Sequence, residues 1–296
     1  MVVVLKNGDS FSSTDDAKLY ITNPTIDLFR KDNSPVRGLM GPLGSGKSSG
    51  CVVEILERAG QQKKGPKGKR RTRWAVVRNT YRELMDTTVK TFLDWCPTTP
   101  GGPPFHWMAT DKIYHITDKD LDCEILFRAL DRPEDVKKLL SLELTGAWVN
   151  EAREIPLTVI DMLDGRVGRF PPEREEGCTW AGIILDSNPP TTRSWWYERF
   201  EKAKAPGWRV FKQPSGLAPD AENRHNLRSG YYDRLAAGKS DEWCKVYVKG
   251  DYGFVLEGRP VYPEYFDAVH CTSARLEVMK GHPLLLGWDF GLTPAC

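Results

Sequence analysis

Short apolar runs alternate with longer amphipathic segments through the first two thirds of the chain. The run Val36–Met40 predicts a strand, and Ser48–Ala59 soon after it predicts a helix. Three further apolar runs have the length of buried strands: Trp74–Val77, Gly146–Val149 and Gly182–Leu185. Strands that alternate with helices in this way are typical of a mainly parallel α/β sheet.

Other segments predict shorter elements between these strands. Tyr81–Trp95 predicts a helix that ends before Pro97, and Pro133–Leu140 predicts a shorter helix. His106–Ile116 and Cys123–Leu130 predict two paired strands on either side of a polar turn. The sheet is therefore expected to combine flanking helices with one strand pair.

The character of the sequence changes after Pro190. Residues 191–260 are aromatic and charged, with helical patterns at Trp195–Ala203 and Tyr231–Leu235. We therefore expect a core domain over residues 1–190 and a smaller lid or linker subdomain over residues 191–260.

Near the end of the sequence, residues 283–291 form a new apolar run. A strand that begins a fold and then stops indicates a further domain that is incomplete here. Residues 261–296 are accordingly expected to hold a linker and the first strand of that truncated domain.

The overall charge does not indicate a partner, because the formal net charge is only +2. The charge is unevenly placed, however: seven of the eleven residues in Lys63–Arg73 are Lys or Arg. Such a run can neutralise the phosphates of a nucleic acid. It can equally be a solvated, mobile loop, and the sequence leaves both interpretations open.

The cysteines give no sign of a disulfide framework or a zinc site. The seven are widely spaced, and no C-x-x-C pair occurs. Reduced thiols in a cytoplasmic protein are the expectation. No apolar stretch approaches about 18 residues, so no membrane-spanning segment is expected.

The first predicted strand leads into a complete Walker A motif, G-x-x-x-x-G-K-S. Its glycines allow backbone N–H groups to converge on the phosphates of a nucleotide, with Lys47 reaching the terminal phosphates and Ser48 binding magnesium. The predicted helix places its positive end under the same phosphates. The expected nucleotide-binding residues are Gly41, Pro42, Leu43, Gly44, Ser45, Gly46, Lys47, Ser48 and Ser49. The motif predicts ATP binding and magnesium-dependent hydrolysis.

A second polar strand end follows at Asn150 and Glu151. A P-loop ATPase needs one residue there for the water shell of the metal and a carboxylate to orient the attacking water. Asn150 stands where an aspartate is usual and supplies no charge, so Glu151 is the expected catalytic carboxylate beside Lys47. The alternative is an ordinary strand-to-helix junction with Asn150 as its N-cap.

Two further features complete the candidate site. Ser187 and Asn188 follow the next predicted strand, where small polar side chains can sense the terminal phosphate or simply form a turn before Pro189. Hydrolysis also needs an arginine against the developing charge. The sequence does not choose among four candidates: Arg78, Arg128, Arg166 and Arg169.

The order of these motifs resembles the large terminase subunit of tailed double-stranded DNA bacteriophages. After the Walker loop come Arg78–Leu84, Trp148–Ala152, Ser187–Pro190 and Trp195–Tyr197. Gly250–Gly253, Val261–Pro263 and Gly287–Gly291 then complete the series. The resemblance implies an α/β P-loop NTPase of the ASCE type, with a mainly parallel sheet, flanking helices and a small lid subdomain.

The resemblance also implies a function. Such a protein uses ATP and Mg²⁺ to translocate double-stranded viral DNA into a procapsid, as a homo-oligomeric ring at the portal protein with a small terminase subunit as partner. It works in the cytoplasm of the infected bacterial host. Ser187 and Asn188 correspond to the motif that couples hydrolysis to movement. A trans-acting arginine would come from the neighbouring subunit, so an isolated monomer is expected to hydrolyse ATP slowly.

By the same resemblance, Asp289 corresponds to the first metal-binding aspartate of a ribonuclease-H-like nuclease. That nuclease needs several carboxylates on two Mg²⁺ or Mn²⁺ ions, and the others would lie beyond Cys296. The chain therefore resembles the ATPase half of a terminase, and no DNA cleavage is expected of it.

Three other functions remain open at this stage. A helicase or other nucleic-acid translocase would carry a second motor domain, which is not seen in this sequence. A P-loop kinase would need an arginine-rich lid, and Lys63–Arg73 lies too close to the loop helix to form one. A nucleotide switch that does not hydrolyse ATP, or an inactive fragment, is suggested by Asn150 and opposed by Glu151.

Overall fold

The computed structural model describes residues 4–5, 19–254, 267–271 and 281. The chain divides into two units, Met1–Val255 and Leu256–Cys296. Within the second unit, α10 (Asp267–His270) is described. The predicted strand at 283–291, together with Asp289, lies outside the described residues.

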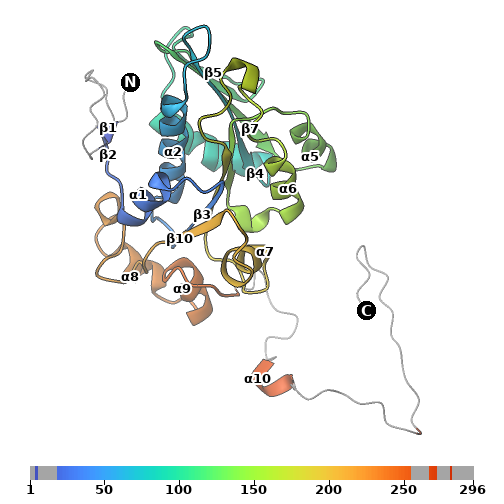
Figure 1. Ribbon diagram of the computed structural model, residues 1–296. Helices are drawn as coiled ribbons and strands as arrows, with labels where there is room; N and C mark the ends of the chain where they lie inside the picture. Colours follow the sequence, from blue (N-terminus) through green and yellow to red (C-terminus); the bar gives the residue numbers. More distant parts are fainter. Residues whose placement is uncertain (1–3, 6–18, 255–266, 272–280, 282–296) are drawn as a thin grey trace. The chain divides into compact units, whose positions relative to one another are not determined.

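The first unit is built on an eight-stranded sheet with the order β10-β3-β9-β8-β4-β7-β6-β5 (Figure 1). The five pairings from β10 across to β7 are parallel, and β6 and β5 continue the sheet antiparallel. The predicted mainly parallel sheet is therefore confirmed. The strands are β3 (Val36–Met40), β4 (Arg70–Arg78), β5 (Phe105–Met108), β6 (Ile113–Ile116), β7 (Leu121–Ala129), β8 (Gly146–Asn150), β9 (Gly182–Ser187) and β10 (Trp208–Lys212). A separate two-stranded sheet pairs β1 (Val4–Leu5) with β2 (Leu19–Tyr20).

Helices cover both faces of the sheet (Figure 1). The α-helices are α1 (Pro24–Lys31), α2 (Lys47–Gln61), α3 (Tyr81–Glu83), α4 (Lys90–Trp95), α5 (Pro133–Leu139), α6 (Leu157–Asp164), α7 (Trp195–Tyr197), α8 (Tyr231–Ala236) and α9 (Asp241–Tyr247). Over residues 19–254 the structure also has the π-helical turns η1 (Leu84–Val89) and η4 (Glu198–Lys202) and the 3₁₀ turns η2 (Ala152–Glu154), η3 (Glu173–Glu175) and η5 (Arg224–Asn226). The helix predicted at 81–95 is thus α3, η1 and α4 in succession.

Successive side chains along the central strands point to opposite faces of the sheet, so each strand contributes to two hydrophobic cores, one on each face. Trp148 and Ile184 pack with the apolar sides of α1, α2 and α4. Val149 and Leu185, their neighbours in sequence, pack with α5, α6, α7 and η4 on the opposite face. Because both faces are buried, these strands are apolar throughout and show no polar alternation.

The strand order brings the predicted site residues to one edge. β9 lies between β3, which leads into the Walker loop, and β8, which ends at Asn150. All three strands are parallel, so their carboxyl ends meet at the same edge of the sheet. A strand inserted between the loop strand and the strand that ends in the acidic residue is the ASCE arrangement that the resemblance implied. Here the inserted strand is β9.

The basic run Lys63–Arg73 is only partly a loop. Its last four residues, from Arg70, belong to β4, which corrects the interpretation of the whole run as a mobile loop. Arg70 and Lys64 both bind Asp120, and these hydrogen bonds lower the pKa of that carboxyl to about 2. Arg71 and Arg73 in turn pair with carboxylates on neighbouring segments. Much of the positive charge of the run is therefore balanced within the fold.

The region expected to form a separate subdomain contributes to the main sheet. Its strand β10 pairs in parallel with β3 over five residues, from Trp208 opposite Val36 to Lys212 opposite Met40. Among the described residues, no helix is long and apolar enough to cross a membrane.

Candidate active site

The loop between β3 and α2 needs its glycines for two different reasons. Gly44 and Gly46 have left-handed backbones, with φ of +72° and +85°. A residue with a side chain is strained in that region. At Gly41 the constraint is space, because a Cβ there would lie 2.4 Å from Oε1 of Gln213. The loop is therefore fixed in shape by both its own backbone and its surroundings.

Lys47 lies buried inside this loop. Its ammonium donates hydrogen bonds to the carbonyl oxygens of Gly41 (3.1 Å) and Pro42 (2.7 Å). Burial lowers the pKa of Lys47, and the negative charges of Glu151 and Asp186 oppose that shift. The ammonium therefore sits where the loop and two carboxyl groups converge.

Ser48, Asn150 and Asp186 form a hydrogen-bonded cluster at the start of α2. The Ser48 hydroxyl donates to Asp186 at 3.0 Å, and the Asn150 amide nitrogen donates to both carboxylate oxygens at 3.0 and 3.1 Å. The Asn150 oxygen instead accepts from the Thr88 hydroxyl at 2.7 Å. This network assigns the amide orientation, with nitrogen rather than oxygen toward Ser48.

Glu151 directly follows β8 and has a left-handed backbone, φ 50° and ψ 53°. For a residue other than glycine this conformation costs about 1–2 kcal/mol, and such strain gathers at functional sites. Its carboxylate lies 3.5 Å from the backbone nitrogen of Asn188 and 3.8 Å from Nε of Arg153. The side chain is partly exposed, so a water molecule has access to it.

Ser187 and Asn188 lie between the loop and Glu151. The Asn188 amide donates to the Gly41 carbonyl at 2.8 Å. The Ser187 hydroxyl donates to the Asn188 carbonyl at 2.7 Å, and the Ser187 carbonyl accepts from the Gly41 backbone nitrogen. The structure therefore brings together the loop, Glu151 and the two residues predicted to couple hydrolysis to movement.

The four arginine candidates are not brought together. Arg78 is buried at the end of β4, where it donates to the Asn150 carbonyl at 3.4 Å. Arg128 lies on β7, which β4 separates from β8, and donates to the Asp111 carbonyl. Arg166 and Arg169 bind Leu144 through their backbones, just before β8 begins. These last two therefore lie at the edge of the sheet away from the loop.

A fifth arginine, which the sequence reasoning missed, lies beside the glutamate. Arg153 is on the turn η2, two residues after Glu151, and donates to the Tyr247 hydroxyl at 2.9 Å. The Tyr247 carbonyl also accepts a hydrogen bond from the backbone nitrogen of Leu43 in the loop, at 2.9 Å. The position of Arg153 directly after the predicted acidic strand end was the one available signal.

Residues after β10 hold the loop from its other side, which no local sequence pattern indicated. Gln213 exchanges hydrogen bonds with Ser45, accepting from its hydroxyl and donating to its carbonyl. The Asn223 amide binds the Gly44 carbonyl, and the Tyr232 hydroxyl binds the Leu43 carbonyl. These contacts connect residues 168 or more positions from the loop to its backbone.

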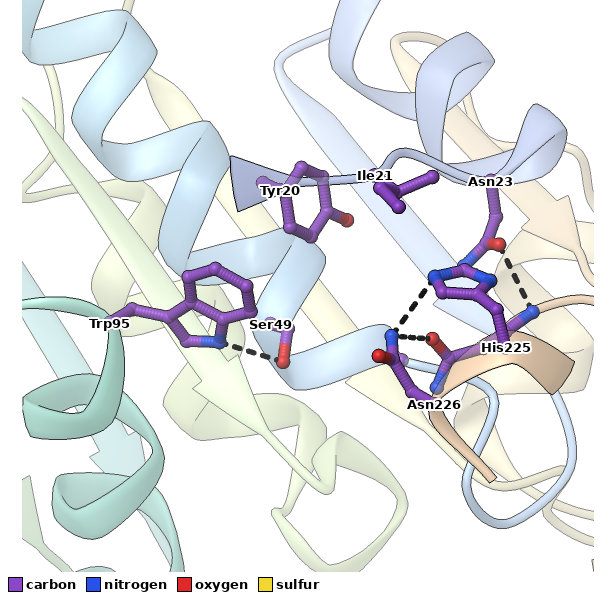
Figure 2. Close-up of a pocket in the computed structure, with 9 residues that line it drawn as sticks. Tyr20, Ile21, Asn23, Ser49, Trp95, His225 and Asn226 are labelled. Atoms are coloured by element: carbon purple, nitrogen blue, oxygen red, sulfur yellow. Dashed lines mark hydrogen bonds between the residues drawn. The ribbon is translucent and has the colours of Figure 1, made fainter. Parts of the chain in front are cut away.

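A pocket of about 220 Å³ opens beside the helix end of the loop (Figure 2). Tyr20 and Trp95 meet edge to face in its wall, with ring centres 5.4 Å apart, and the Trp95 indole donates to Ser49 at 2.9 Å. Asn226 and His225 lie across the pocket. Aromatic rings with amides opposite them suit a flat heterocycle with polar edges.

The cluster around Ser48 also fits a magnesium ion. Mg²⁺ prefers oxygen ligands and usually takes only one or two from the protein, the rest being waters and phosphates. The Ser48 hydroxyl and the Asp186 carboxylate provide such oxygens next to the loop. Within the described residues, no group of three or more His, Cys, Asp or Glu side chains forms a metal cluster.

The sheet order, the lysine-bearing loop and the glutamate beside it define an ASCE-type P-loop nucleotide-binding domain. Comparison with known families then identifies the chain more closely. It matches the model of the phage terminase large subunit over residues 34–228. This is more than half of its length, so the chain belongs to that family. No curated protein matches it in sequence.

Solved structures of large terminases share the fold. The large terminase of a thermophilic bacteriophage has a TM-score of 0.60 at 12% identity, over 77% of this chain and 52% of that one. The same terminase in complex with ADP has a TM-score of 0.59 at 13% identity. The large terminase ATPase domain of Thermus phage P74-26 has a TM-score of 0.54 at 15% identity, over 79% of this chain and 94% of that domain. The chain thus spans about half the length of the first of these terminases.

Proposed function

We propose that this chain binds ATP with Mg²⁺ at the loop between β3 and α2 and hydrolyses it to move double-stranded viral DNA. One observation supports hydrolysis above all: Glu151 is held in a strained backbone conformation beside the loop, with its carboxylate 3.5 Å from the Asn188 nitrogen. A protein that only binds nucleotide has no need of a carboxylate placed in this way.

Each residue of the site has a definite task in this proposal. The loop N–H groups and Lys47 hold the β- and γ-phosphates, and Ser48 binds the metal. Bound Mg²⁺ would offset the negative charge of the phosphates. Glu151 orients the attacking water and takes up its proton. Because Lys47 and Glu151 both lie beside the loop, the terminal phosphate and the water would be brought together there.

The pocket beside the loop is the proposed site for the adenine and ribose. Its aromatic wall of Tyr20 and Trp95 supplies an apolar surface, and Ser49 belongs both to the pocket and to the predicted nucleotide-binding residues. The large terminase of the thermophilic bacteriophage has been solved with ADP and with ATP-γ-S, which supports a nucleotide in a fold of this type.

Coupling of hydrolysis to movement would pass through the contacts of the loop. Asn188 binds the Gly41 carbonyl from one side, whereas Tyr232 and Asn223 bind the Leu43 and Gly44 carbonyls from the other. A change in loop shape when phosphate leaves would alter both sets of contacts together. Residues 213–247 would then move relative to β9.

Membership of the family supports a proposal about the partners. We propose that the chain acts on double-stranded DNA as a homo-oligomeric ring at the portal of a procapsid, with a small terminase subunit, in the cytoplasm of an infected bacterium. The nuclease role of Asp289, with Mg²⁺ or Mn²⁺, remains a proposal about residues outside those described.

The decisive experiment compares steady-state ATP hydrolysis with nucleotide binding in Glu151→Gln. The substitution keeps the shape of the side chain and removes its charge. Turnover should fall by about 100-fold or more, because a positioned general base contributes that much. Binding of Mg²⁺–ADP should change little, because Glu151 contacts the water rather than the nucleotide.

Glu176→Gln is the matched control. Glu176 is also a glutamate in the left-handed region, with φ 93°, but it is exposed in the loop that precedes β9. Its substitution should leave turnover unchanged. Equal activity in wild type and Glu151→Gln would contradict the proposal.

A non-hydrolysing nucleotide switch is the second candidate. The observation in its favour is Asn150, a neutral residue whose amide nitrogen faces Ser48. For this candidate, the wild type would bind ADP and ATP tightly and show no turnover at any protein concentration, with or without DNA.

A further inference from the structure

We propose that Asp186 is the carboxylate that holds the magnesium ion, in place of the neutral Asn150, so that this charge has moved from β8 to the neighbouring strand β9. The inference rests on the proposed function, because it concerns the ion bound with ATP. It assigns to Asp186 a role that the sequence pattern had suggested for Asn150.

The sheet register places the two residues side by side. Asn150 on β8 is the direct partner of Asp186 on β9. Both side chains lie on the face of the sheet that α2 covers, as the contacts of each with Ser48 show. Asp186 is the nearer, with its carboxylate oxygen 3.0 Å from the Ser48 hydroxyl against 3.3 Å for the Asn150 nitrogen. A one-strand shift therefore leaves the carboxylate within reach of the same metal position.

The charge of Asp186 is poorly balanced by the protein itself. The side chain is fully buried, and its hydrogen-bond donors are the neutral groups of Ser48, Asn150 and Trp148, the last at 2.7 Å. In the described part of the chain no ion pair is formed with it: the Lys47 ammonium is near enough for its charge to be felt but donates its hydrogen bonds to loop carbonyls instead. A buried carboxylate without a paired cation is unfavourable, and a divalent ion beside Ser48 would remove that penalty.

This assignment also gives a physical reason for the neutral side chain at position 150. Its amide nitrogen bridges both Asp186 oxygens, and the Thr88 hydroxyl fixes its oxygen on the far side. An aspartate at position 150 would place a second carboxylate about 3 Å from the carboxylate of Asp186, where like charges repel. Asn150 is thus a positioning residue that orients the metal-binding carboxylate.

The test measures how strongly Mg²⁺ tightens ADP binding, as the ratio of Kd in EDTA to Kd in Mg²⁺ by calorimetry. Four proteins are compared: wild type, Asp186→Asn, the swap Asn150→Asp with Asp186→Asn, and the control Asp161→Asn. Asp161 is an exposed aspartate on α6. The ratio should fall by about 10- to 100-fold in Asp186→Asn, because loss of a group that holds or orients a metal typically has that effect.

The swap should restore most of the tightening of ADP binding by Mg²⁺, since it again places one carboxylate at position 150 or 186. Urea unfolding without nucleotide gives an independent readout: Asp186→Asn should be at least as stable as wild type, because it removes a buried charge. An unchanged ratio in Asp186→Asn, or a loss that the swap does not recover, would overturn the inference. Failure of the wild type to bind ADP under either condition would instead overturn the proposed function.

Discussion

Asn188 contacts both sides of the proposed site through two different groups. Its side-chain amide holds the Gly41 carbonyl of the loop at 2.8 Å, and its backbone nitrogen lies 3.5 Å from the Glu151 carboxylate. A substitution of the side chain therefore removes the first contact and leaves the second in place. This separates the placement of the loop from the placement of the glutamate.

We expect Asn188→Ala to lower kcat for ATP about tenfold, which corresponds to the loss of one hydrogen bond of about 1.4 kcal/mol. The affinity for Mg²⁺–ADP should remain within a few fold, because the phosphate-binding N–H groups are untouched. Steady-state kinetics and calorimetry on the same preparation measure both quantities.

Asn33→Ala is a suitable control, because Asn33 is exposed and contacts Arg58 well away from the loop. If Asn188→Ala lowered affinity and kcat by the same factor, Asn188 would act in nucleotide binding rather than in the hydrolysis step.

At this scale the sequence predicted residues whose role follows from a local motif. Lys47 and Ser48 belong to a contiguous loop, and Glu151 directly follows an apolar strand. Asp186 was not among the predicted site residues, because its meaning depends on its pairing with Asn150, which is 36 positions away. Gln213 and Tyr232 were missed for the same reason, since no local pattern shows that their segment returns to the loop.

At the scale of elements, replacing glycine by alanine is expected to change the free energy of unfolding in opposite directions in β3 and in α2. Gly38 lies in β3, and a Cβ there would be 2.8 Å from the Trp196 ring and 2.9 Å from Phe200. Gly60 is exposed near the end of α2, and a Cβ there would have no neighbour within 4 Å. Gly38 thus allows η4 and α7 to approach the sheet, whereas Gly60 only weakens its helix.

We expect Gly38→Ala to lower the free energy of unfolding by about 1–3 kcal/mol through overpacking. Gly60→Ala should raise it by about 0.5–1 kcal/mol, because alanine favours the helix. Urea denaturation of the two variants measures both, and a destabilised Gly60→Ala would show that this glycine has a contact or backbone role not seen in α2.

Elements could be predicted where the length of an apolar run determines them, as for β3, β8 and β9. The π turn η1 inside the predicted helix was not, because α and π turns differ in hydrogen bonding rather than in composition. This turn carries Thr88, whose hydroxyl binds Asn150, so the irregularity belongs to the site. The ion pairs of the basic run could not be predicted, because its partners Asp120 and Glu175 lie on other segments.

At the scale of the whole molecule, the arginine for hydrolysis can be tested by mixing subunits. Arg128, Arg166 and Arg169 lie outside the site of their own chain, so any of them would have to act on a neighbour. In a ring, one subunit presents a different face to the next. A subunit without its arginine and a subunit without its glutamate could therefore complement each other.

We expect one of the variants Arg128→Ala, Arg166→Ala or Arg169→Ala to lose turnover when it is tested alone. Mixed in equal amounts with Glu151→Gln, that variant should regain about a quarter of wild-type turnover. In a random head-to-tail ring, about one site in four combines an intact glutamate with an intact arginine from the next subunit. Arg78→Ala is the control, because Arg78 binds Asn150 within its own subunit and should show no recovery. If no mixture recovers activity, the arginine acts within one subunit, where Arg153 is the nearest to Glu151 among the described arginines.

The buried ammonium of Lys47 has a thermodynamic consequence. It already donates to the Gly41 and Pro42 carbonyls, so an arriving phosphate exchanges these bonds for new ones instead of adding to them. Only the difference between the two sets contributes to affinity. The released Gly41 carbonyl keeps its bond from Asn188, and the Pro42 carbonyl lies 2.8 Å from the Ser45 hydroxyl, whose single proton it shares with Gln213. In the proposed ATP hydrolysis, release of the product would be assisted in the same way, because the loop carbonyls offer the lysine replacement partners.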